Sequence, residues 1–182
     1  MQQKDAVQLV TARFGHASAV HGGKLFISGG LDSNQQLSSV EVLDLSVGRM
    51  EMRAQSMQRG RAFHTLVEVN GELYAVGGDL LLQSGMSIEK MSNETGAWQL
   101  IVDDYEGGGH RIGCATVAVG SNIFVFGGCN VFRTIHNRTW DALDVSTMQW
   151  ASAIIPEESR RLPRDIFVMG QAVLLPPLYE LD

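Results

Sequence analysis

Short apolar runs that end on two adjacent glycines recur along the chain at a nearly constant distance. The best defined run is Gly-Glu-Leu-Tyr-Ala-Val-Gly-Gly at residues 71–78. Offsets of 48 and 50 residues separate the arginines that precede the successive runs, which are Arg13, Arg61 and Arg111. A fixed period of this length indicates a repeat architecture, so the repeat decides the fold before any single element does.

Each repeat unit predicts four β-strands. In the middle unit, apolar or β-branched runs cover 62–69, 72–76, 87–91 and 98–102. Runs of this length between clusters of Gly, Asn, Asp and Ser are typical of strands. Asn70-Gly71 is a strong hairpin signal, because both residues tolerate positive φ. No window shows a sustained helical period, and a unit of about 50 residues with four antiparallel strands is typical of one blade of a β-propeller.

The in-phase positions are expected to serve the scaffold. A glycine pair at the end of a strand suits positive φ or a close approach to a neighbouring strand. The expected structural repeat residues are Gly29, Gly30, Gly77, Gly78, Gly127, Gly128, Arg13, Arg61, Arg111, Trp98 and Trp150. A large ring stands three residues before each pair and is expected to fill the space between blades. Burial is predicted for Leu25, Phe26, Ile27, Leu73, Tyr74, Val76, Phe124, Val125 and Phe126.

The order of these residues resembles a known repeat. Over residues 7–175 the units are similar to the kelch repeat. Taken together, they contain in order the patterns Arg-x-x-His, Gly-x-Leu-Tyr-x-Val-Gly-Gly, Val-Glu-x-x-Asp and Trp. The resemblance implies an all-β fold, a kelch-type β-propeller. Three positions depart from the family pattern: Met50 stands in place of Trp, Cys114 in place of His and Ser92 in place of Asp.

The predicted propeller is partial. Residues 1–182 are expected to form a single propeller domain or a fragment of one, with full blades at 13–56, 61–103 and 111–155 and single extra strands at 7–10 and 164–175. Propellers usually close with four to eight blades, so three blades leave two open faces. The chain could be part of a longer kelch protein, could pair with a second copy or another kelch chain, or could join its extra strands into a thin fourth blade. The first explanation is favoured.

Composition narrows the functional classes. The net charge is −6 without a basic run, which disfavours a nucleic-acid partner. No apolar stretch approaches the roughly 18 residues of a membrane span, and the polar N-terminus lacks a signal region. Cys114 and Cys129 could form a disulfide, but without a signal region we expect reduced, buried thiols in a cytoplasmic protein.

Candidate chemistry is sparse. His16 and His64 follow the repeat and are expected to be structural, whereas His21, His110 and His136 are dispersed without the spacing of metal ligands. No catalytic residue, metal site or cofactor is therefore predicted.

The loops after the glycine pairs are the predicted recognition surface, because repeat positions serve the scaffold and loops carry binding. The third loop, 129–139, contains arginines and an aromatic residue, which are favoured in binding hot spots. Its apolar side chains could instead fold back onto the propeller. The candidate partner-binding residues are Asn34, Gln35, Asp79, Gln83, Asn130, Phe132, Arg133 and His136.

The sequence thus favours a protein-interaction module. The family resemblance implies roles such as a substrate adaptor of a ubiquitin ligase or a cytoskeletal scaffold, with a protein as the partner. The alternative is a carbohydrate-active kelch enzyme, such as a sialic-acid epimerase, whose site consists of scattered residues lining the channel. A convergent pocket containing Arg, Glu and His would favour the enzyme.

Overall fold

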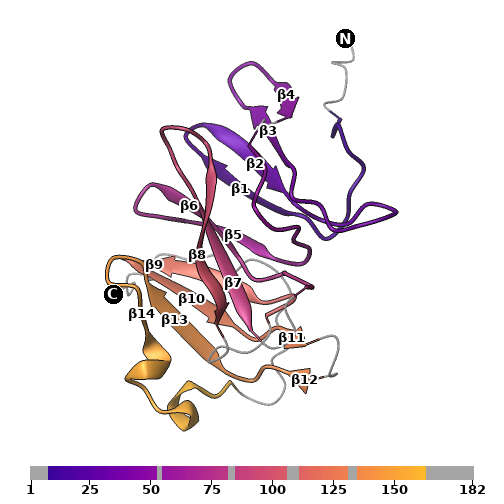
Figure 1. Cartoon of the computed structure of the whole chain (residues 1–182). Coiled ribbons are helices and arrows are strands. Elements are labelled where there is room, and N and C mark those ends of the chain that lie inside the picture. Colours follow the sequence, from indigo (N-terminus) through magenta and orange to yellow (C-terminus); the bar gives the residue numbers. More distant parts are fainter. Residues whose placement is uncertain (1–7, 53–54, 82–84, 106–110, 131–134, 163–182) are drawn as a thin grey trace, which may run out of the picture.

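A computed structural model describes residues 8–52, 55–81, 85–105, 111–130 and 135–162 of the chain. These residues form three four-stranded antiparallel sheets, which follow one another as the chain runs from the indigo to the orange end of Figure 1. The fold is an all-β, partial kelch-type propeller.

Each sheet is built from strands that are consecutive in the chain, apart from a short ribbon inserted in the third. The first sheet contains β1 (Ala17–His21), β2 (Lys24–Ser28), β3 (Val40–Asp44) and β4 (Arg49–Met52). The second contains β5 (Thr65–Val69), β6 (Glu72–Val76), β7 (Met86–Met91) and β8 (Trp98–Tyr105). The third contains β9 (Ala115–Val119), β10 (Asn122–Phe126), β13 (Trp140–Asp144) and β14 (Gln149–Trp150). The ribbon is formed by β11 (Cys129–Asn130) and β12 (Ile135–His136).

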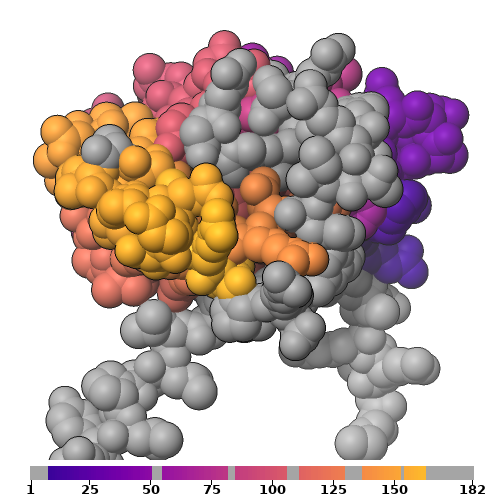
Figure 2. Space-filling view, turned by 90° about the horizontal axis from the view of Figure 1, so that it is seen from below, coloured from indigo at the N-terminus to yellow at the C-terminus, as the bar shows by residue number. Residues whose placement is uncertain are grey.

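Two 3₁₀ turns follow the third sheet, η2 (Ala151–Ala153) and η3 (Glu157–Arg160). The first of them packs on β13. In Figure 2 both turns (yellow) lie at the same end of the molecule as the orange residues of the third sheet.

The strand order within each sheet gives the arrangement of propeller blades. Hydrogen-bonded order equals chain order, and the first strands β1, β5 and β9 contact one another from sheet to sheet. They are therefore the innermost strands, and the sheets fan outward from them. The predicted hairpin between β5 and β6 is confirmed, since Asn70 and Gly71 have φ of 53° and 74°.

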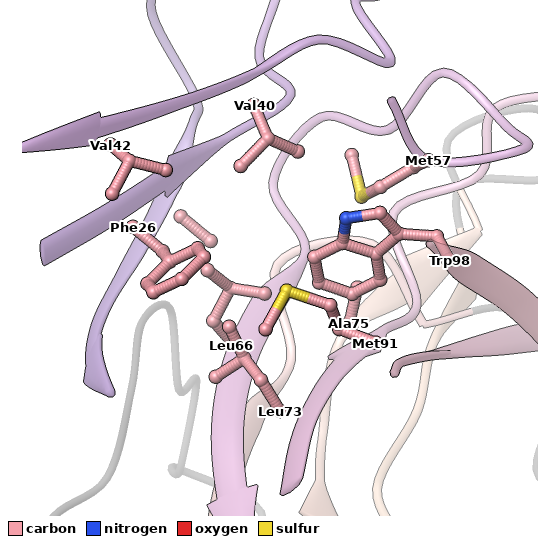
Figure 3. Close-up of a cluster of buried hydrophobic side chains, with 10 residues drawn as sticks. Phe26, Val40, Val42, Met57, Leu66, Leu73, Ala75, Met91 and Trp98 are labelled. Atoms are coloured by element: carbon pink, nitrogen blue, oxygen red, sulfur yellow. The ribbon is translucent and has the colours of Figure 1, made fainter. Parts of the chain in front are cut away.

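The core lies between the sheets. We call the surface of a sheet that packs on the following sheet its far face, and the surface that packs on the preceding sheet its near face. In the first interface, Phe26 on the far face of sheet one lies among side chains of sheet two, including Leu66, Met91 and Trp98 (Figure 3). In the second interface, Tyr74 on sheet two lies in one cluster with near-face residues of sheet three such as Ile123. Burial of one such side chain stabilises the fold by roughly 1.5–3 kcal/mol.

The burial predictions are confirmed for Phe26, Leu73, Tyr74, Val76 and Val125, which lie within these two interfaces. They are also confirmed for Ile27, which lies on the near face of sheet one. They are wrong for Leu25, Phe124 and Phe126, which are only partly buried. Leu25 lies on the near face of sheet one, and the two phenylalanines lie on the far face of sheet three. No described sheet packs against either surface.

The segment before the first sheet differs from its prediction. Residues 8–10 form no strand. Instead, the backbone N–H groups of Val10 and Thr11 donate to the Glu41 carboxylate at 2.7 and 2.9 Å. This contact fixes the entry of the chain without a sheet ladder. The second expected extra strand, 164–175, lies outside the described residues.

A buried arginine stabilises the inner end of each sheet. Arg13, Arg61 and Arg111 donate to the carbonyl oxygen of the first glycine of each pair, at 2.7, 2.8 and 2.6 Å. In the first two sheets the arginine also pairs with a glutamate, Arg13 with Glu41 at 2.7 Å and Arg61 with Glu89 at 2.9 Å. All four of these side chains are fully buried, so the charges of each pair are shielded from water.

The third sheet breaks this pattern, because Asp141 is one methylene shorter than the glutamates. Its carboxylate accepts from the Tyr105 hydroxyl and the Ser152 N–H, both at 3.0 Å. It also lies 3.6 Å from the Arg160 guanidinium. The Nε of Arg111 is buried without a hydrogen-bond partner. In the third sheet Arg111 therefore donates to Gly127 O and to Thr139, and Arg160 pairs with the carboxylate in its place.

Candidate functional site

The loops that follow the glycine pairs lie along one edge of the sheets, which we call the glycine rim: residues 29–39, 77–81, 127–130 and 135–139. The pairs join neighbouring blades there. Gly30 N donates to Arg61 O at 2.7 Å and Gly78 N donates to Arg111 O at 3.2 Å. A Cβ atom on Gly77, whose φ is 72°, would lie 2.4 Å from Arg111 O. Both reasons expected for glycine, positive φ and close approach, therefore hold at this position.

The first loop presents polar side chains. The Asp32 carboxylate accepts hydrogen bonds from the backbone N–H groups of Asn34 and Gln35 at 2.7 and 2.8 Å, and these bonds lower the pKa of Asp32. Asn34 and Gln35 are exposed, so their side chains are accessible to a partner. The neighbouring Gln36 donates from Nε2 to Gly78 O at 3.0 Å and ties this loop to the second one.

The second loop shows why Asp79 organises the rim instead of presenting a binding group. Asp79 is 3% exposed, and its carboxylate pairs with the Arg59 guanidinium at 2.9 Å and accepts from Leu81 N at 3.0 Å. Arg59 also reaches Asp103 at 2.6 Å, and its side chain keeps 24% exposure. The accessible charged group here is therefore Arg59. Gln83 lies outside the described residues.

The third loop is described only at its base. Cys129 pairs with His136 and Asn130 pairs with Ile135 in the ribbon formed by β11 and β12. Asn137 N donates to Gly128 O at 2.8 Å and joins the returning strand to the glycine pair. Phe132 and Arg133 lie outside the described residues, so their predicted role in binding stays a prediction, as does that of Asn130 and His136.

An aromatic pair at the rim escaped the sequence reasoning. Gly15, Phe63 and Gly113 occupy in-phase positions, and the chain links them by hydrogen bonds, from Phe63 N to Gly15 O at 2.7 Å and from Gly113 N to Phe63 O at 2.8 Å. Phe63 has φ of 54°. A bulky residue in this left-handed conformation is an outlier, which costs roughly 1–2 kcal/mol relative to glycine.

The Phe63 ring lies beside a second, more exposed ring. The ring centroids of Phe14 and Phe63 are 6.3 Å apart at an interplanar angle of 65°. Phe14 is 59% exposed, and its backbone pairs with Leu31 at the start of the first loop. Strained backbone conformations persist mainly at functional sites. The sequence signal that would have revealed this site is a phenylalanine at the place of two in-phase glycines.

The buried titratable groups near the rim serve the structure. His64 is 5% exposed, and its Nε2 lies 2.7 Å from Ser28 Oγ. Burial lowers the pKa of His64 to about 3, so its imidazole is neutral at physiological pH. Burial also raises the pKa of the Cys114 thiol to about 11, and Cys114 and Cys129 are not joined by a disulfide bond. Within the described ranges, no group of three His, Cys, Asp or Glu side chains is arranged to hold a metal ion.

Comparison with known proteins decides the family. Residues 12–49 match the Kelch motif, and this stretch contains Arg13, the first glycine pair and strands β1 to β3 together with Arg49, the first residue of β4. This part of the chain is thus a Kelch motif, and the resemblance to the kelch-repeat family that the sequence predicts is confirmed. None of the helical segments in the described residues is long and apolar enough to cross a membrane.

Two curated proteins and one solved structure are similar to parts of the chain. Kelch-like protein 15 from Homo sapiens is 29% identical over 137 residues, which are 64% of this chain and 22% of that protein. Kelch-like protein 40 from Xenopus tropicalis is 35% identical over 75 residues, 41% of this chain and 12% of that protein. The kelch chain thus spans about a fifth or less of these relatives. A solved structure titled "Structure of YjhT" matches with a TM-score of 0.64 at 16% identity, over 76% of this chain and 51% of that chain.

Proposed function

We propose that this kelch chain is a protein-interaction module that binds a segment of a protein partner at the glycine rim, with Phe14 and Phe63 as the apolar anchor. The observation that carries the proposal is Phe63 in a left-handed conformation at a position that is glycine in the other two repeats. The fold has no need of a ring there, since glycine fits the same backbone without strain. Because the Phe63 ring is kept despite the strain in its backbone, we attribute it to contact with a ligand.

The surroundings of this anchor suit a protein ligand. Interface hot spots combine a central aromatic anchor with a ring of polar contacts. In the first loop, whose first residue Leu31 pairs with Phe14, the exposed Asn34 and Gln35 supply amide groups that can hydrogen-bond a backbone. Arg59, held by Asp79, supplies a positive charge at the second loop. The binding role that the sequence predicts for Asn130, His136, Gln83, Phe132 and Arg133 stays part of the proposal.

The relatives refine the proposal. Two of the similar proteins are named Kelch-like proteins, and we place this chain with them as a cytoplasmic substrate adaptor or scaffold, including the adaptor of a ubiquitin ligase as one form of that role. The enzymatic alternative requires Arg, Glu and His around one pocket. A hollow at the third sheet is lined by Arg160 and Tyr105 among other residues, and none of the described residues that line it is a glutamate or a histidine. Protein binding is therefore the proposed function.

The test uses a library of displayed peptides selected on the 182-residue chain. Phe63→Gly removes the ring and keeps a backbone that the other repeats adopt, so we expect a folded protein whose affinity for the selected peptides falls at least tenfold. Val47→Ser is the matched control, because Val47 is apolar, 72% exposed and lies in the turn between β3 and β4, outside the glycine rim.

Two results would contradict the proposal. If the selected peptides bind the wild-type protein and Phe63→Gly with equal affinity, the aromatic pair is not the anchor of the binding site. Turnover of a sialic acid by the chain, unaffected by the same substitution, would favour the enzymatic alternative.

A further inference from the structure

Two apolar sheet faces stay unmatched in the described part of the chain. The far face of sheet three carries Val117, Phe124, Phe126, Trp140 and Ala142, and the near face of sheet one carries Val20, Leu25, Ile27, Leu43 and Met50. Faces of this kind mark interaction surfaces when they gather several apolar residues.

The unmatched far face is built like the two far faces that already have partners. Phe124 occupies the in-phase position of Phe26 and Tyr74, which are each 2% exposed in the two observed interfaces, whereas Phe124 is half-buried. Its ring lies 5.8 Å from that of Trp140 and 6.3 Å from that of Phe126. These three rings form an aromatic surface in the place where the other sheets receive a following blade.

The unmatched near face is built like the two near faces that receive those rings. Leu43 on sheet one is in phase with Met91, which packs beside Phe26 in the first interface (Figure 3). Met50 is in phase with Trp98 of the same cluster. The two free faces of the chain therefore repeat the two halves of an interface that the protein already forms.

We propose that these faces bind each other between two copies of the chain, so that sheet three of each copy packs on sheet one of the other. Two identical interfaces, related by a twofold axis, then close one ring of six sheets and cover both of the unmatched faces described above. Six sheets lie within the usual range of four to eight blades for closed propellers.

Two further observations support a second copy as the occupant. The matched part of the chain corresponds to 51% of the YjhT structure, so a second arc of equal size supplies the length that remains.

Beside sheet three, a hollow of about 230 Å³ is lined in part by Ala142, Ile154 and Ile155, and Ile154 is 74% exposed. In the first interface, Met57 from the linker before sheet two packs next to Trp98, which is in phase with Met50. The hollow is thus suited to receive Met50 of the second copy.

The experiment measures the mass of the 182-residue chain by sedimentation equilibrium. We expect a species of twice the 19.9 kDa of one chain. Phe124→Glu on the far face and Leu43→Lys on the near face should each weaken association at least 100-fold, because each places a charge in both interfaces of the ring. Val47→Lys, in the turn of the same sheet at 72% exposure, should leave the mass unchanged.

Mixing the two variants gives the sharpest outcome. A ring of one Phe124→Glu chain and one Leu43→Lys chain contains one unaltered interface and one that opposes glutamate to lysine, so equimolar mixing should restore the paired species. A wild-type chain that sediments as a monomer overturns the proposal, whether or not the variants fold. So does a larger assembly that neither variant alters, or a mixture that stays monomeric while both variants are folded by circular dichroism.

Discussion

The buried ion pair between Arg61 and Glu89 is the most consequential single contact of the scaffold. The Glu89 carboxylate accepts from Arg61 Nη2 at 2.9 Å, from Arg61 Nε at 3.1 Å, and from the backbone N–H groups of Gln58 and Arg59 at 2.6 and 3.1 Å. Both charged side chains are fully buried. One carboxylate thus fixes the arginine, the linker between two sheets and the third strand of sheet two.

Replacing Glu89 by Gln keeps the volume of the side chain but removes its charge. The guanidinium of Arg61 then stays buried without an opposite charge, and the new amide hydrogens face N–H donors. Breaking a buried pair by removing one partner costs about 3–5 kcal/mol. Burial by itself already lowers the pKa of Arg61, which shows that the site disfavours an uncompensated charge. We expect Glu89→Gln to lower the free energy of unfolding by that amount.

Urea unfolding monitored by circular dichroism measures this change from the midpoint and slope. Glu94→Gln is the control, because Glu94 is exposed in the turn between β7 and β8 and should change stability by less than about 0.5 kcal/mol. Glu41→Gln should act like Glu89→Gln, since the Arg13–Glu41 pair is equally buried. A Glu89→Gln protein within about 1 kcal/mol of wild type would refute this reasoning.

Three further predictions concern backbone conformation and pH. Gly77→Val should destabilise the chain by at least the roughly 1–3 kcal/mol of a strained backbone, because φ is positive and a Cβ would clash with Arg111 O; an unchanged melting temperature would contradict this. Met148→Gly should raise stability by about 1 kcal/mol, since Met148 has φ of 58° where the in-phase residues are glycines; no gain in the urea midpoint would argue against strain there. His64, whose pKa burial lowers to about 3, is neutral in the folded state and binds a proton only on unfolding near its ordinary pKa of about 6.5. The free energy of unfolding should therefore decrease as pH falls below about 6.5, by about 2 kcal/mol at pH 5. His64→Gln should make the free energy of unfolding less dependent on pH in this range.

The scaffold could be predicted from the sequence because each repeat places the same residue types at the positions with the same backbone geometry. A single Gly-Gly is compatible with any turn, but three in phase require a shared backbone geometry, and Gly29, Gly77 and Gly127 all have positive φ. The arginines were predicted as structural for the same reason. Their hydrogen bonds to the glycine carbonyls explain why they recur.

Side-chain exposure was harder to predict because it depends on what lies across each face. Phe124 has the same pattern as Phe26 and Tyr74, yet it is only half-buried, because exposure is set by a neighbouring sheet and not by the strand. Asp79 looked like a polar loop residue, and its burial follows from Arg59, which lies 20 residues earlier in the sequence. No local pattern contains that information.

The candidate site was only partly visible in the sequence. Asn34 and Gln35 are exposed on the rim, which agrees with a binding role. The Phe14–Phe63 pair was overlooked because each phenylalanine alone resembles an ordinary apolar residue. Only the alignment of Phe63 with Gly15 and Gly113, together with its φ of 54°, distinguishes it.

The central claim is that a protein ligand binds the glycine rim around Phe63. Amide chemical-shift mapping by NMR, with a peptide selected on the chain, tests it most directly. We expect the largest shifts at Phe14, Leu31 and Phe63, and none at the opposite edge, where the turns around Gly48 and Gly96 lie. Shifts confined to those turns would contradict the account.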